Sequence, residues 1–205
     1  MIRIATCLLG TGAALLLAAC ASAPIHYYTL VPAATAATPR DAGAAASLRF
    51  ELLPVGIPAQ VDQPQLVVRE GGQAVALLDG ERWIAPLGDE VRSALSVDLA
   101  QILPGQDVSS LPGSDKPVLR IKLDLRRFDS QPGGYALIDG GWSVRALQQP
   151  QHGMLACTSR IRETVGPGYG ALVQGHQRAI RRLAEQIAGV AQALGAGRSA
   201  SCPSD

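Results

Sequence analysis

The segment at residues 171–194 limits the possible folds more than any other part of this chain. Its apolar side chains recur with helical spacing and fall on one stripe, which also holds His176. The stripe consists of Leu172, Ile180, Leu183, Ile187, Val190 and Leu194. Gly195 follows and is typical of a helix end. A helix with one apolar stripe must bury that stripe, so we expect it to cover a β-sheet.

Alternating apolar and polar residues predict the strands of that sheet. The clearest example is 118–128, where four aliphatic residues face one way and four charged residues face the other. The other predicted strands are 25–30, 47–55, 65–69 and 73–78 as a hairpin, 135–138, 142–147 and 154–164. Asp79-Gly80 ends the predicted hairpin, and residues 139–141 form either a turn or a bulge within one long strand.

A second amphipathic helix is predicted at residues 89–103, where Pro104-Gly105 stops it. Its stripe contains Val91, Leu95, Leu99 and Ile102. Two such helices and about six strands in one chain predict an α/β fold, in which the helices cover faces of a shared sheet.

The first twenty residues indicate export and lipid attachment. Arg3 precedes an apolar run at 4–19, and Leu17-Ala18-Ala19 leads directly into Cys20. This is the anatomy of a bacterial lipoprotein signal: the cysteine thiol receives diacylglycerol, the chain is cut just before the cysteine, and the new amino terminus receives an N-acyl chain. The alternatives are an ordinary secreted protein with an incidental Cys20, or an uncleaved anchor. The run is shorter than the roughly 20 residues that span a bilayer.

We therefore divide the chain into four parts: a signal peptide at 1–19, a lipidated tether at 20–24, a single domain at 25–195 and a flexible tail at 196–205. The residues after Cys20 are Ala21 and Ser22 rather than the aspartate that retains lipoproteins at the inner membrane. We therefore expect the periplasmic face of the outer membrane.

Charge and cysteine content restrict the possible partners further. Removal of the signal takes Arg3 from the 18 basic side chains, so 17 remain against 17 acidic ones. A neutral chain argues against nucleic acid, which requires a cationic surface.

Cys157 and Cys202 remain in an oxidising compartment, either as a disulfide or as a buried thiol and a loose tail thiol.

Candidate site residues are few. Trp83 precedes the second helix and is either a partner contact or a packing residue, and Arg69 at a strand end is either a partner contact or solvated. His26, His152 and His176 are scattered, so no metal site is predicted. The chain has neither Gly-x-Ser-x-Gly nor His-Glu-x-x-His.

The order of these features resembles the ABC-type transport auxiliary lipoproteins of the PqiC/YmbA group. The resemblance rests on Cys20, the Tyr-Tyr-Thr-Leu strand at 27–30, Pro-Val-Gly-Ile-Pro at 54–58 leading to 62–69, the Arg-Trp-Ile-Ala-Pro-Leu run at 82–87, and the long C-terminal helix. It implies a three-layer α/β/α sandwich with a mixed sheet, similar to anticodon-binding domains.

The resemblance also implies a function. Such a protein would be an outer-membrane docking component of an ABC/MCE-type intermembrane lipid transport system, with a periplasmic MCE-type protein as its partner and self-association into a ring. It implies no catalytic residues and no cofactor beyond the lipid on Cys20. The alternatives are a periplasmic lipid carrier with its own cavity and an envelope hydrolase, for which the chain offers no nucleophile and base.

Overall fold

The computed structural model of the chain describes residues 24–33, 48–111, 118–147 and 153–204. The predicted signal peptide, Cys20 and His152 lie outside these ranges. In chain order the elements are β1 (His26–Tyr28), β2 (Leu48–Leu52), β3 (Gln65–Gly71), β4 (Ala74–Trp83), α2 (Leu87–Ile102), β5 (Gly105–Asp107), β6 (Leu119–Gln131), β7 (Tyr135–Ala146), β8 (Met154–Thr164) and α3 (Tyr169–Gly195). Neither described helix is long and apolar enough to cross a membrane.

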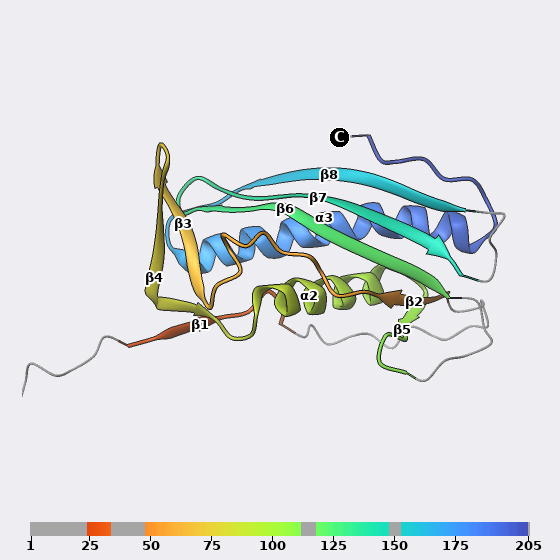
Figure 1. Cartoon of the computed structure of the whole chain (residues 1–205), viewed down its shortest axis with the longest axis horizontal. Helices are drawn as coiled ribbons and strands as arrows, with labels where there is room; N and C mark the ends of the chain where they lie inside the picture. Colours follow the sequence, from red (N-terminus) through yellow and green to blue (C-terminus); the bar gives the residue numbers. More distant parts are fainter. Residues whose placement is uncertain (1–23, 34–47, 112–117, 148–152, 205) are drawn as a thin grey trace, which may run out of the picture.

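A mixed five-stranded sheet forms the body of the molecule, with the strand order β5-β2-β6-β7-β8 (Figure 1). β2 is parallel to β5 and β6, whereas β7 is antiparallel to β6 and β8. Residues 139–141 lie inside the single strand β7, so of the two alternatives the structure has one long strand rather than a turn. The bulge itself is in β6, between Leu125 and Arg127. Gly140 is required opposite it, because a Cβ there would lie 2.7 Å from the Asp124 carbonyl oxygen.

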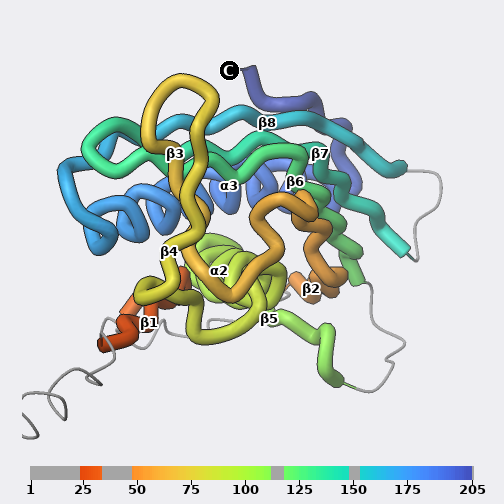
Figure 2. The backbone as a smooth tube through the Cα atoms, turned by 60° about the vertical axis from the view of Figure 1, so that its left-hand side comes forward, coloured from red at the N-terminus to blue at the C-terminus, as the bar shows by residue number. Residues whose placement is uncertain are grey.

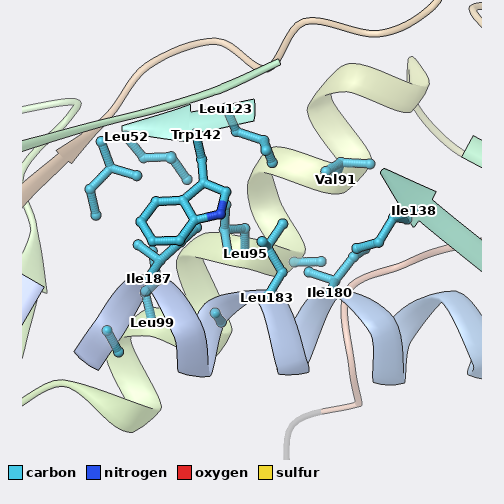
Figure 3. Packing of buried hydrophobic residues seen from close by; sticks show 14 of the residues in the cluster. Leu52, Val91, Leu95, Leu99, Leu123, Ile138, Trp142, Ile180, Leu183 and Ile187 are labelled. Atoms are coloured by element: carbon cyan, nitrogen blue, oxygen red, sulfur yellow. The ribbon is translucent and has the colours of Figure 1, made fainter. Parts of the chain in front are cut away.

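Both helices pack against the same face of this sheet (Figures 1 and 2). The core between them contains Trp142 and Leu123 from the sheet, Leu95 from α2, and Leu183 and Ile187 from α3 (Figure 3). The α/β class, the mixed sheet and the two main helices are confirmed. The layers differ from the predicted α/β/α sandwich, because α2 and α3 pack side by side. On the opposite face of β6, Arg120, Lys122, Asp124 and Arg126 are exposed.

A smaller sheet with the order β1-β4-β3 stands at one end of the molecule (Figure 2). β3 and β4 form the predicted hairpin, and β1 runs parallel to the last residues of β4. Asp79-Gly80 does not end the hairpin as predicted. β4 continues to Trp83 because β1 supplies new pairing partners there, and the register between β3 and β4 shifts between Gln65 and Leu66 to absorb the extra residues.

Candidate functional site

A groove with a volume of about 440 Å³ opens between the β3–β4 hairpin and β6. Its apolar lining includes Val61, Val67, Val75 and Leu77, and its ionised lining consists of Arg69, Arg126, Arg127 and Asp129. We call this the docking groove. Leu66 and Val68 of β3 are buried in the core, so the alternate residues of the hairpin line the groove. Val75 and Leu77 are 54% and 52% exposed, which is unusual for aliphatic side chains on adjacent positions of one strand face.

Asp129 is the electrostatic centre of the docking groove. Arg69 on β3 donates a hydrogen bond to Asp129 over 3.3 Å. Arg127 also donates to Asp129, and both of these residues lie on β6. The hydrogen bond to Asp129 raises the pKa of the Arg127 guanidinium. Arg126 pairs with Asp139 at 2.8 Å on the rim. Three cations therefore meet two carboxylates, which leaves the groove with an excess of positive charge.

The Arg69 side chain is therefore neither unpaired nor fully solvated. Its side chain is 30% exposed, and it joins the hairpin to the large sheet across 60 residues of sequence. The Nε atom of Arg69 has no partner among the described residues. The guanidinium is consequently fixed in direction by Asp129, with donor capacity to spare.

Trp83 lies in the core beneath the docking groove, with 6% of its surface exposed. Its ring meets Phe128 edge-on at a centroid distance of 6.1 Å, and Phe128 stacks on His176 at 3.9 Å. These contacts favour the packing interpretation of Trp83. The His176 Nε2 atom lies 2.8 Å from the Ser130 hydroxyl, and burial lowers the pKa of His176 to about 3, so the ring is neutral.

The residues that follow the predicted tether are held firmly against the domain. Buried Glu90, in the first turn of α2, accepts hydrogen bonds from the Thr29 hydroxyl at 2.8 Å and from the Leu30 amide at 2.7 Å. Burial, together with a hydrogen bond to Glu81, raises the pKa of Tyr28 to about 12. A lipid anchor attached to the chain before β1 would therefore be joined to the domain at a fixed position.

The tail that follows α3 is covalently joined to the edge strand β8. Cys157 and Cys202 form a disulfide with a Cα–Cα distance of 5.5 Å, across 45 residues of sequence.

Among the described residues, no group of histidine, cysteine, aspartate and glutamate side chains is arranged to hold a metal ion. His26 pairs with Glu81 at 3.1 Å.

Two solved structures share the fold of this chain. An uncharacterized protein is 19% identical, with a TM-score of 0.62 over 81% of this chain and 97% of its own. A Xanthomonas campestris protein of family DUF330 is 16% identical, with a TM-score of 0.56 over 83% of this chain and 97% of its own. The comparison with curated proteins gives no match.

The family model described as "ABC-type transport auxiliary lipoprotein component" matches residues 28–188. This chain belongs to that family. The match extends from the end of β1 into α3, so it covers the docking groove and the attachment of β1 in this auxiliary lipoprotein.

Of the groove residues of this auxiliary lipoprotein, only Arg69 was predicted from the sequence as a possible partner contact. Val75 and Leu77 belong to the apolar run of the second hairpin strand, where both strand faces are apolar. That pattern is the available signal, since a hairpin with one solvated face alternates apolar and polar residues. The pairing of Arg69 with Asp129 had no such signal, because it depends on how the hairpin lies on β6.

Proposed function

We propose that this auxiliary lipoprotein is the docking subunit of an ABC/MCE-type intermembrane lipid transport system. Lipid on Cys20 holds it at the periplasmic face of the outer membrane, and the docking groove binds a periplasmic MCE-type protein. The observation that carries the proposal is the pair of exposed aliphatic side chains, Val75 and Leu77, beside a fixed cluster of arginines. Family membership supports the transport role.

The groove chemistry defines the partner segment. Two half-exposed aliphatic side chains and an apolar floor favour apolar side chains from the partner. The surplus of arginine over carboxylate in the lining favours a segment that also carries aspartate or glutamate. Because the Arg69–Asp129–Arg127 cluster is already paired, its guanidinium groups need little reorganisation when a carboxylate arrives.

Membrane attachment lets a small interface suffice. A tethered domain meets a membrane-spanning assembly at a high effective concentration, so a modest intrinsic affinity gives stable association. The firm attachment of β1 through Glu90 keeps the groove at a restricted orientation to the anchor, which raises that effective concentration further.

Co-purification tests this function. The acylated full chain is extracted natively from the cells that produce it, and we expect a periplasmic MCE-type protein to be isolated with it as a complex. A chain with both Val75→Ser and Leu77→Ser should lose the complex, whereas Met154→Ser should keep it, since Met154 is also 52% exposed but lies on β8. Absence of the complex with the unchanged chain overturns docking, and an unaffected double variant overturns the groove assignment.

The lipid carrier remains a second candidate, and one observation weakens it. Four ionised side chains line the docking groove, and an acyl chain would have to displace water from them. Lipid in the native mass spectrum of a Cys20→Ala chain would favour the carrier, and its absence favours docking. Native mass spectra of the acylated complex, measured separately, would give the number of copies in the expected ring. We propose no enzymatic activity.

A further inference from the structure

A second apolar surface lies at the end of the small sheet opposite the docking groove. It consists of Ile25, Tyr27 and Ile84, which are 45%, 57% and 60% exposed. Tyr27 pairs with Arg82 in the parallel β1–β4 register, and the Ile84 amide donates to the Tyr28 carbonyl at 2.9 Å. Alternation along β1 puts Ile25 and Tyr27 on one face, while His26 and Tyr28 on the other face both reach Glu81. We call these three residues the anchor-side patch.

We propose that the anchor-side patch lies in the interface of the lipid bilayer and fixes the orientation of the domain on the membrane. This rests on the proposed lipid attachment at Cys20. Ile25 lies only five positions after Cys20, so even an extended chain keeps this end of the patch within about 18 Å of the acylated cysteine. Pro24, the first described residue, already lies against Gly80 of β4, beside the patch.

The composition of the patch suits this location. Tyrosine is enriched where a bilayer meets water, because its ring is apolar and its hydroxyl stays hydrated. Arg82 on the same face is placed to meet anionic headgroups, with its Nε donating to the Asp79 carbonyl at 3.0 Å. Three side chains give weak insertion alone, but the acyl chains hold them at the surface.

Membrane contact at the patch determines the direction of the docking groove. Leu77 and Ile84 are seven positions apart along β4 and its continuation, which corresponds to about 23 Å of extended strand. Because one lies in the groove and the other in the patch, insertion of the patch points the groove away from the bilayer and into the periplasm (Figure 1). A transport component approaching from the periplasm would then find the groove unobstructed.

Fluorescence quenching tests the orientation. The acylated full chain with Tyr27→Trp is placed in vesicles of phosphatidylethanolamine and phosphatidylglycerol, with or without brominated acyl chains. The matched control is Leu77→Trp, and the unchanged chain gives the background from Trp83 and Trp142, which are both buried. We expect a blue shift and a loss of emission for the tryptophan at position 27, and no change for the one at position 77. Ile84→Ser added to Tyr27→Trp should reduce the loss.

Each outcome decides the inference. Mass spectrometry of the same samples establishes whether Cys20 carries lipid. Lipid on Cys20 with an unquenched tryptophan at position 27 overturns the patch and leaves the anchor intact. Quenching at position 77 in its place reverses the orientation and also overturns the inference. An unmodified Cys20 overturns the anchor and the patch together. Unchanged unfolding curves of the variants confirm that the exposed substitutions leave the fold intact.

Discussion

In the five-stranded sheet nearly all described apolar side chains are at least partly buried, with Met154 at the start of β8 the exception, whereas in the three-stranded sheet several are more than half exposed. Trp142, Leu123 and Ile138 of the large sheet are each at most 3% exposed beneath α2 and α3. In the small sheet, Val75 and Leu77 of β4 and Tyr27 of β1 are each more than half exposed. The two regions meet where Trp83 contacts Phe128 edge-on and Phe128 stacks on His176. Stability is therefore concentrated in one region and binding capacity in the other.

The largest effect is expected in the centre of the large sheet. Trp142→Ala should lower the free energy of unfolding by about 3–5 kcal/mol, because it removes a buried indole between both helices and leaves a cavity. The indole N–H donates to Ser159 at 2.8 Å, and that hydroxyl donates to Gln186 of α3 at 2.6 Å. Urea unfolding of a Cys20→Ala chain measures the loss, with Trp142→Phe as the smaller control. A loss below about 1 kcal/mol would contradict the division between the two regions.

The elements of the large sheet were also the ones that sequence could predict. Regular alternation identified β2 and β6, and single stripes identified α2 and α3, because burial on one face imposes a period on the sequence. β5 was missed, since Gly-Gln-Asp has neither apolar residues nor a detectable period. It forms a strand only because β2 offers it a partner. The arrangement of the layers was not predictable from periodicity either, because periodicity does not specify which sheet face a helix covers.

The small sheet was predicted less well for a related reason. Its hairpin is a local element and was recognised, but its length and surface depend on distant contacts. β4 extends to Trp83 because β1 pairs with it across more than 50 residues of sequence. Arg69 is oriented by Asp129, 60 residues away. Apolar residues on both hairpin faces were visible in the sequence, but only the structure separates the face that packs from the face that lines the groove.

The disulfide should contribute the next largest effect. Replacing Cys157 and Cys202 together by serine should lower the free energy of unfolding by about 2–4 kcal/mol, because the bond restricts a loop of 45 residues in the unfolded chain. Thermal unfolding with and without a reducing agent provides the control, since the double variant should no longer respond to reduction. Equal stability of the oxidised and reduced chains would show that the tail adds nothing to the large-sheet region.

The junction between the two regions should be sensitive to acid. The His176 ring is fully buried and binds a proton only near pH 3, whereas in the unfolded chain its pKa is near 6.5. Between these values the unfolded chain binds more protons, so stability falls as pH falls. From pH 7 to pH 5 this group alone should remove about 2 kcal/mol. His176→Phe should reduce the pH dependence of urea unfolding by that amount, and an unchanged pH dependence would contradict the neutral stacked ring.

The smallest effect is expected from the exposed side chains of the small sheet. Val75→Ser with Leu77→Ser should change the free energy of unfolding by no more than about 0.5 kcal/mol, because neither side chain contributes to the buried core. Urea unfolding of the double variant beside Trp142→Ala measures this directly. If the double variant proved as unstable as a core variant, the hairpin face would be part of the folding core. Near-neutral stability together with loss of the partner complex would instead show that these aliphatic side chains are retained for binding.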